Sequence, residues 1–167
     1  KIVFPPDRNR GAYSHAGPGR DLVLWDGSCI VHDVFSNEKI NGIRGQYPDS
    51  LLVAHPEYES KILDVVEFIG STSKMIDYIR DSSATEFIIA TEAGILDSMK
   101  KVVPNKTLIP APIFENNACA CSECPYMKVN SLQKLYDCLL NEFPAIEIDS
   151  SLREKALAPI LRMLTYS

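Results

Sequence analysis

The chain has 167 residues, of which 46% are hydrophobic and 23% are charged, a balance typical of a soluble globular protein. This composition excludes a disordered tail, a collagen-like repeat and a coiled coil. With 17 basic and 22 acidic side chains, the formal charge is −5 and the pI is near 5.2, which argues against binding to nucleic acid or to an anionic membrane surface. No apolar run approaches the roughly 20 residues that span a bilayer. Residues 1–7 lack the apolar stretch of a signal peptide.

Short apolar runs alternate with helical patterns along most of the chain. Because the runs are unbroken, they predict parallel strands that are covered on both faces. Strand, helix and strand at this spacing predict an α/β fold of repeated three-layer αβα units with parallel sheets. The predicted strands are Ile2–Phe4, Leu22–Leu24, Leu51–Ala54, Phe68–Ile69, residues 87–90 and residues 108–109, and the predicted helices are residues 37–47, 59–66, 72–80 and Ile95–Val102.

The last part of the chain has a different pattern. Apolar residues at helical spacing predict a helix from Asn130, with Asn130 or Ser131 as its cap. A second helix should start near Ser151 with a capping box, and Pro159 should kink it. Residues 145–148 could add a strand between the two helices. We expect these helices to clamp the sheet layers together.

A stretch rich in proline and asparagine, residues 110–118, is the predicted linker. It divides the chain into an α/β region of residues 1–110 and a region of residues 111–167 with a cysteine-bearing loop and closing helices. The first region also carries polar segments directly after three of its strands, where ligands of open α/β folds bind. These segments are His55-Pro56-Glu57, residues 70–73 and residues 91–94.

Two of the polar segments suggest chemistry. His55 and Glu57 can act as an acid–base pair near neutral pH. Ser71 or Thr72 can place a hydroxyl beside free helix amides, which favour an anion. A purely structural role is also open for each of these residues. Ser71 or Thr72 could serve only as a helix cap, and His55 could be a surface histidine. Glu92 could be a carboxylate that faces a helix dipole.

Five cysteines without a secretory signal indicate a reducing, cytoplasmic compartment rather than a disulfide framework. Cys119, Cys121 and Cys124 lie within six residues, and the last two form a Cys-x-x-Cys pair. Such a pair can bind zinc, take part in redox exchange or hold an iron–sulfur cluster. Zinc is the weaker alternative, because a second pair of cysteines or histidines at zinc-finger spacing is missing. Cys29 is placed to be a distant ligand, and Cys138 is interpreted as a packed helical cysteine.

Several segments, in the same order and over essentially the whole chain, resemble the quinolinate synthase family. They are Asp7-Arg8-Asn9, Trp25-Asp-Gly-Ser-Cys29-Ile-Val-His32, His55-Pro56-Glu57, residues 68–73, residues 87–95, residues 124–128, residues 130–135 and residues 153–164. The resemblance implies a transferase of NAD biosynthesis that condenses iminoaspartate with dihydroxyacetone phosphate to give quinolinate. It also implies three similar α/β domains, pseudo-symmetric around a central 4Fe–4S cluster with one cysteine ligand from each. The iron without a protein ligand can then act as a Lewis acid on substrate oxygens.

The resemblance also implies roles for individual residues. Cys29 and Cys124 match two of the three cluster ligands. The segment His55-Pro56-Glu57 matches one that contacts substrate, and we expect His55 and Glu57 to be catalytic. Thr72 matches a hydroxyl that binds a substrate carboxylate.

Two features depart from the family pattern. Cys121 matches a cysteine linked to a regulatory disulfide in some members, but its usual companion position is Ala118 here, so the pattern does not support a redox switch. The family's first domain, with its cluster cysteine, has no counterpart, and we expect an additional N-terminal domain in the full protein. The alternative hypothesis is a non-catalytic metal- or partner-binding module derived from this fold, with thiol-bound zinc or no metal.

Overall fold

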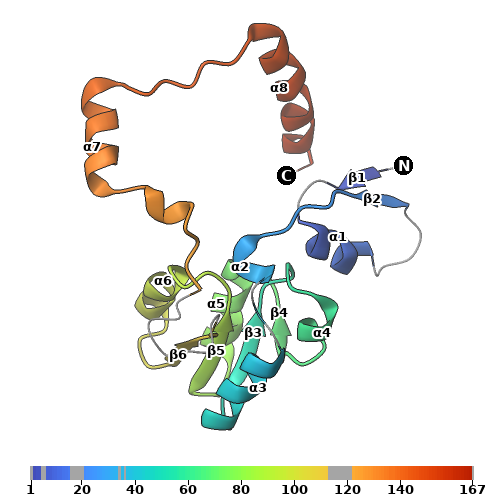
Figure 1. The fold of residues 1–167 in the computed structure, drawn as a ribbon, viewed down its shortest axis with the longest axis vertical. Helices are drawn as coiled ribbons and strands as arrows, with labels where there is room; N and C mark the ends of the chain where they lie inside the picture. Colours follow the sequence, from blue (N-terminus) through green and yellow to red (C-terminus); the bar gives the residue numbers. More distant parts are fainter. Residues whose placement is uncertain are drawn as a thin grey trace. The chain divides into compact units, whose positions relative to one another are not determined.

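A computed structural model describes residues 2–4, 7–15, 21–33, 35, 37–112 and 122–166. The chain divides into two compact units, Lys1–Pro125 and Tyr126–Ser167 (Figure 1). Most of the predicted linker, together with Cys119 and Cys121, lies outside the described residues. The domain division expected between residues 110 and 111 stays a prediction.

A four-stranded sheet forms the centre of the first unit, and all of its strands are parallel. The strand order β4-β3-β5-β6 can be followed from right to left in Figure 1. A separate two-stranded sheet pairs β1 with β2, also in parallel. These findings confirm the predicted α/β class with parallel sheets, and every strand predicted in the first region is present. The strands are β1 (Ile2–Phe4), β2 (Leu22–Leu24), β3 (Leu51–Ala54), β4 (Phe68–Ile69), β5 (Glu86–Ala90) and β6 (Thr107–Pro110).

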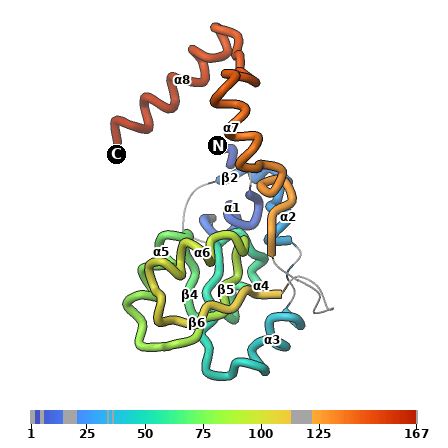
Figure 2. The backbone as a smooth tube through the Cα atoms, turned by 90° about the vertical axis from the view of Figure 1, so that its left-hand side faces the viewer, coloured from blue at the N-terminus to red at the C-terminus, as the bar shows by residue number. Residues whose placement is uncertain are grey.

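Four helices cover the two faces of the central sheet: α3 (Asn37–Gln46), α4 (Ser60–Leu63), α5 (Thr72–Asp81) and α6 (Ile95–Val102). Successive residues of β5 point to opposite faces. Ile88 therefore lies in a buried cluster with side chains of α3 and α4, whereas Ile89 lies in a second cluster with side chains of α5 and α6. Figure 2 shows α3 and α4 on one side of the strands and α5 and α6 on the other. This two-sided burial explains the unbroken apolar runs, and each such side chain contributes about 1.5–3 kcal/mol. The helix predicted over residues 59–66 is shorter than expected, because the chain turns at Asp64 towards β4.

The N-terminal part contains a helix that the apolar pattern did not predict, α1 (Arg8–His15). Its sequence, Arg-Asn-Arg-Gly-Ala-Tyr-Ser-His, has no periodic apolar face. The helix packs closely on the two-stranded sheet, because a Cβ atom on Gly11 would lie 2.5 Å from Leu24 Cδ2. Glycine is therefore suited to this position. A second short helix, α2 (Ile30–Asp33), directly follows Cys29.

The second unit contains a 3₁₀ turn, Met127–Val129, and the helices α7 (Leu132–Asn141) and α8 (Ser150–Leu164). Ser131 caps α7, as one of the two predicted alternatives, and its Oγ accepts a hydrogen bond from the backbone N–H of Lys134 at 3.2 Å. The side chain therefore satisfies one of the free amides at the helix start.

The start of α8 differs from the prediction. Its cap is Asp149, whose Oδ1 accepts a hydrogen bond from the backbone N–H of Leu152 at 3.0 Å. The capping box expected at Ser151 is wrong, because an aspartate two residues earlier already satisfies the free amide. The helix continues through Pro159. Residues 145–148 do not form the strand considered above, since none of the described strands pairs with them.

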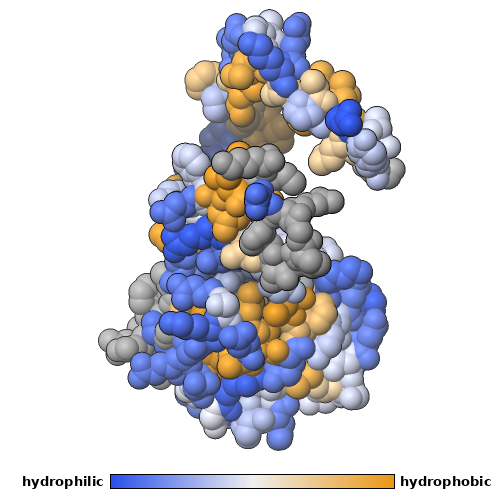
Figure 3. Space-filling view, turned by 90° about the vertical axis from the view of Figure 1, so that its right-hand side faces the viewer, coloured by the Kyte–Doolittle hydropathy of each residue, from blue (hydrophilic) through white to orange (hydrophobic). Residues whose placement is uncertain are grey.

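Apolar side chains lie on the surface of each unit (Figure 3). In the two-stranded sheet, Val3 and Val23 are 66% and 43% exposed. On α7, Leu132 and Leu139 are 86% and 73% exposed and mark a stripe along the helix. The expected role of the C-terminal helices in clamping the sheet layers stays a prediction. Within the described ranges, no helix has both the length and the apolar character needed to cross a bilayer.

Candidate active site

The loops that follow the strands meet at the carboxyl edge of the central sheet. The backbone N–H of His55 donates to the carbonyl of Ala90 at 3.2 Å, which extends the pairing of β3 with β5. The backbone N–H of Gly70 donates to the carbonyl of Ala54 at 3.1 Å, so the loop after β4 reaches the same edge. Parallel strands require this arrangement, because all of their carboxyl ends point the same way.

Glu57 lies between two histidines that come from different segments. Its Oε2 atom is 3.1 Å from His32 Nδ1 and 3.6 Å from His55 Nδ1. The two imidazole rings stack, with centroids 5.2 Å apart and planes inclined by 12°. His32 belongs to α2 and is 6% exposed, whereas His55 follows β3 directly. A carboxylate and two imidazoles therefore form one set of groups that can exchange protons.

Burial changes the protonation of these groups. Burial lowers the pKa of His32 and of His55 below the ordinary value of 6.5, although the nearby carboxylate of Glu57 acts in the opposite direction. Both imidazoles are therefore neutral near pH 7, and each has one donor and one acceptor nitrogen. Tyr58 packs against His32 with ring centroids 4.7 Å apart, and burial raises the pKa of its phenol well above 10.0. This phenol stays protonated.

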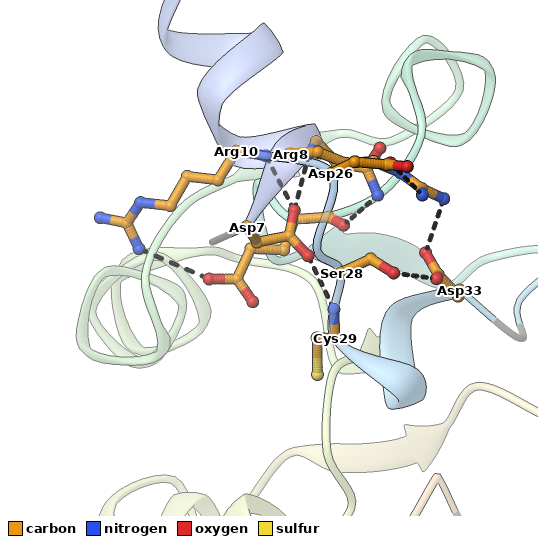
Figure 4. A network of polar contacts seen from close by, with 9 residues as sticks. Asp7, Arg8, Arg10, Asp26, Ser28, Cys29 and Asp33 are labelled. Atoms are coloured by element: carbon orange, nitrogen blue, oxygen red, sulfur yellow. Dashed lines mark hydrogen bonds and ion pairs between the residues drawn. The ribbon is translucent and has the colours of Figure 1, made fainter. Parts of the chain in front are cut away.

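The buried carboxylate of Asp7 joins Cys29 to the start of α1 (Figure 4). Its Oδ1 accepts hydrogen bonds from the backbone N–H groups of Asn9 at 2.7 Å and Arg10 at 3.1 Å, which caps the helix. Its Oδ2 accepts from the backbone N–H of Cys29 at 2.8 Å. Three amides thus stabilise a carboxylate that is only 4% exposed. The position of the Cys29 thiol depends on this residue, 22 positions earlier in the chain.

Helix α1 also contacts the loop after β3. Asn9 Nδ2 donates to the carbonyl of Glu57 at 3.0 Å. Arg10 Nη1 lies 3.8 Å from Glu57 Oε1, and Arg8 forms an ion pair with Asp26 at 3.1 Å. The helix therefore positions both the backbone and the carboxylate of Glu57.

Cys124 lies on a segment that is anchored to the end of β5. Ser122 Oγ donates to the carbonyl of Thr91 at 2.7 Å, and the backbone N–H of Cys124 donates to Glu92 Oε1 at 3.2 Å. Cys29 and Cys124 are both half-buried free thiols. Both pack against the buried cluster on the face of the sheet that α3 and α4 cover. Two thiols from distant segments are thus held against one core.

The hydroxyls at the start of α5 have different positions. Ser71 is the cap, and its Oγ accepts from the backbone N–H of Lys74 at 3.4 Å. Thr72 is half-buried and is the first residue of the helix, close to its free amides. Glu92 accepts a hydrogen bond from the backbone N–H of Gly94 at 2.8 Å, which agrees with its interpretation as a carboxylate at a helix start.

The structure brings together only some of the residues proposed from sequence. The Sγ of Cys29, a ring nitrogen of His32 and a carboxylate oxygen of Glu57 lie within 4.8 Å of one another. His55 contacts the same carboxylate, and Pro56 lies in the turn between the two. Thr72 and Cys124 belong to the same edge of the sheet, but the hydrogen bonds and ion pairs found for the described residues do not link them to Glu57.

Sequence reasoning assigned no role to His32 or to the Asp7 carboxylate. The spacing Cys29-Ile-Val-His32 could have indicated His32, because residues three apart lie on one face of a helix. The contact of Asp7 with Cys29 has no local signal, because the two residues meet only when β1, α1 and β2 pack together.

Comparisons with known proteins identify the family. The family profile described as "Quinolinate synthetase A protein" matches residues 1–165. Quinolinate synthases from Synechococcus sp., Microcystis aeruginosa and Chloroherpeton thalassium are 48%, 50% and 47% identical to the chain over 99%, 99% and 100% of its length. The chain spans about half the length of these relatives, 51–52% of each. The chain belongs to the quinolinate synthetase A family.

Proposed function

We propose that this chain carries part of the active site of a quinolinate synthase. Such an enzyme is a transferase that condenses iminoaspartate with dihydroxyacetone phosphate to quinolinate, the precursor of the NAD pyridine ring. The observation that carries the proposal is the position of Glu57 between His32 and His55 at the strand ends. The condensation releases phosphate and water, so it needs groups that give and take protons near neutral pH.

In this proposal Glu57 and His55 move protons to and from the substrate. His32 orients Glu57, because it is the more buried of the two histidines and lies closer to the carboxylate. Thr72 binds a carboxylate of the substrate at the start of α5, where free amides favour an anion. The assignment of the cap to Ser71 supports this role, since the Thr72 hydroxyl is then not needed to start the helix.

We further propose that Cys29 and Cys124 are two ligands of a 4Fe–4S cluster. Two half-buried free thiols packed against one buried cluster of side chains support this, because cysteine thiolates are the ligands that such clusters require. The third ligand would come from the half of the relatives' length that this chain does not span. When bound, the iron without a protein ligand would supply a Lewis acid for substrate oxygens. A cytoplasmic location, where thiols stay reduced, belongs to the same proposal.

The test uses the complete protein that contains this chain, reconstituted without oxygen. We expect iron and sulfide in equal amounts and a broad visible absorption. Cys124→Ser should lose the cluster, whereas the matched control Cys138→Ser, on α7, should keep it. A retained cluster in Cys124→Ser would reject the ligand assignment, and bound zinc in place of iron would favour the non-catalytic module.

A second variant tests the acid–base role. Glu57→Gln keeps the size of the side chain, so the cluster should be retained. Quinolinate formation should fall by roughly 10²- to 10⁴-fold, the usual contribution of a positioned acid–base group. Unchanged turnover would exclude Glu57 as the proton carrier.

A further inference from the structure

Helix α3 contains two glycines that its surroundings do not require. Gly42 lies in the middle of the helix and Gly45 in its last turn, and both are exposed. Apart from the helix backbone itself, a Cβ atom at either position would meet no heavy atom within 4 Å, and neither residue has a left-handed backbone. Inside a helix, glycine is less favourable than every residue except proline, because it loses the most backbone freedom on folding. The helix is therefore weakened by its own sequence.

Tertiary packing stabilises α3 less than α5, a helix of the same length. Helix α5 buries Met75 and Ile79 completely and packs along β4 and α6. Helix α3 buries a single side chain, Ile40, and its backbone approaches no described strand or helix over as long a stretch. Most of the stability of a helix in a protein comes from the packing of its apolar face. We therefore expect α3 to unfold at a lower free energy than α5.

The polar contacts of α3 do not compensate for this weak packing. Oδ1 of Asn37, the first residue of the helix, is buried and has no hydrogen-bond partner among the described residues. Opening of the helix would give this oxygen access to water. Near the other end, Arg44 forms an ion pair with Glu67, which precedes β4, and both side chains are only half-buried. Ion pairs with this much exposure stabilise a structure weakly.

We propose that α3 is a cover that opens by local unfolding while the central sheet, α5 and α6 stay folded. Helices of one protein can open separately when they bury few apolar side chains. Ile40 belongs to the apolar cluster on this face of the sheet, and Ile43 packs against that cluster. Cys29 and Cys124 pack against the same apolar cluster. Opening of α3 therefore exposes the apolar surface behind both thiols.

One consequence of the opening rests on the proposed function, in which Cys29 and Cys124 hold an iron–sulfur cluster. When α3 opens, the two thiols lose part of the packing that holds them in place. The iron–sulfur cluster should then be released through the open state, and the stability of α3 sets how fast the protein loses its iron.

Hydrogen exchange followed by peptide mass spectrometry tests the opening in the complete protein that contains this chain. In the wild type, the amides of α3 should exchange at least tenfold faster than those of α5. The double variant Gly42→Ala/Gly45→Ala should slow exchange in α3 by roughly 5- to 30-fold and leave α5 unchanged, because alanine favours the helix. Equal exchange of α3 and α5 in the wild type would overturn the proposal. So would a double variant in which α3 is unchanged, or in which both helices become slower.

Two further variants test whether the effect is local. Arg44→Gln keeps a good helix former but removes the ion pair with Glu67, so exchange in α3 should become roughly 1.5- to 5-fold faster. Ser73→Ala is the matched control, since it adds an alanine at an exposed position of α5, and it should leave exchange in α3 unchanged. Slower exchange of α3 in Ser73→Ala would mean that the two helices unfold together, which contradicts a separate opening.

The rate of iron release to a chelator tests the consequence for the iron–sulfur cluster. The complete protein is reconstituted without oxygen, and the double variant should release iron more slowly than the wild type, by the factor found for exchange in α3. Equal release rates would overturn the link between α3 and the iron–sulfur cluster. A wild-type protein that takes up no iron would reject the proposed function, whereas fast exchange in α3 would still support the opening.

Discussion

The two parallel sheets of the first unit are stabilised in different ways. In β5, residues 87–90 are all buried, and helices cover both faces of the central sheet. In the small sheet, Val23 and Leu24 of β2 are 43% and 38% exposed. Helix α1 and the preceding Asp7 are instead joined to the candidate active site by hydrogen bonds. Asp7 accepts from the backbone N–H of Cys29, and Asn9 donates to the carbonyl of Glu57. Apolar burial therefore builds the scaffold, whereas polar contacts position the thiol and the carboxylate of the candidate active site.

Replacement of one valine in each sheet should give the largest difference in the free energy of unfolding. Val53→Ala, at a fully buried position of β3, should lower the free energy of unfolding by about 2–3 kcal/mol, from two lost methyl groups and the cavity left behind. Val23→Ala, in the small sheet, should change it by less than about 0.5 kcal/mol. Urea denaturation measures both. Equal effects would mean that the small sheet is buried in solution.

Removal of the Asp7 carboxylate should weaken the contacts that join α1 to Cys29. Asp7→Ala should lower the free energy of unfolding by about 2 kcal/mol, because the cap of α1 is lost and the Cys29 amide loses its acceptor. The alkylation rate of Cys29, followed by peptide mass spectrometry, should rise at the same time. Asp26→Ala is the control, since that side chain is 91% exposed, and it should change neither quantity. A Cys29 thiol that reacts at the wild-type rate in Asp7→Ala would show that the hydrogen bond does not position it.

The buried histidines of the candidate active site should make the free energy of unfolding depend on pH. Because burial lowers the pKa of His32 and of His55 in the folded state, the unfolded state binds more protons below about pH 6.5. The free energy of unfolding should therefore decrease as the pH falls from 7.5 to 5.5. His32→Gln should flatten this dependence, as measured by urea denaturation at each pH. If the free energy of unfolding of His32→Gln depends on pH as steeply as that of the wild type, groups other than His32 cause the dependence.

The smallest effect concerns the start of α8. Asp149→Ala should lower the helicity of the C-terminal unit and cost about 1 kcal/mol, because Asp149 accepts the amide of Leu152. Ser151→Ala lies inside the helix and should stay within about 0.5 kcal/mol of the wild type. Far-ultraviolet circular dichroism of the two variants provides the measurement. A larger loss of helicity in Ser151→Ala than in Asp149→Ala would show that Ser151 caps the helix.

Local patterns predicted most of the scaffold. The unbroken apolar runs at β3 and β5 predicted strands because burial on both faces leaves no position for a polar side chain. The same rule could not find α1, where a capping carboxylate and a glycine contact replace an apolar stripe. At α8, two possible caps stand two residues apart, and only the backbone geometry selects Asp149.

The sequence by itself determined the α/β class, the strand ends that carry His55 and Glu57, and the position of Cys29 in a turn after a strand. These features depend on periodicity and on chain order, which are local properties. Only the tertiary structure decided which groups meet: Asp7 with the Cys29 amide, Asn9 with the carbonyl of Glu57, and His32 with the Glu57 carboxylate. Contacts between residues 22 and 48 positions apart depend on how strands and helices pack, and no local pattern of residues encodes that packing.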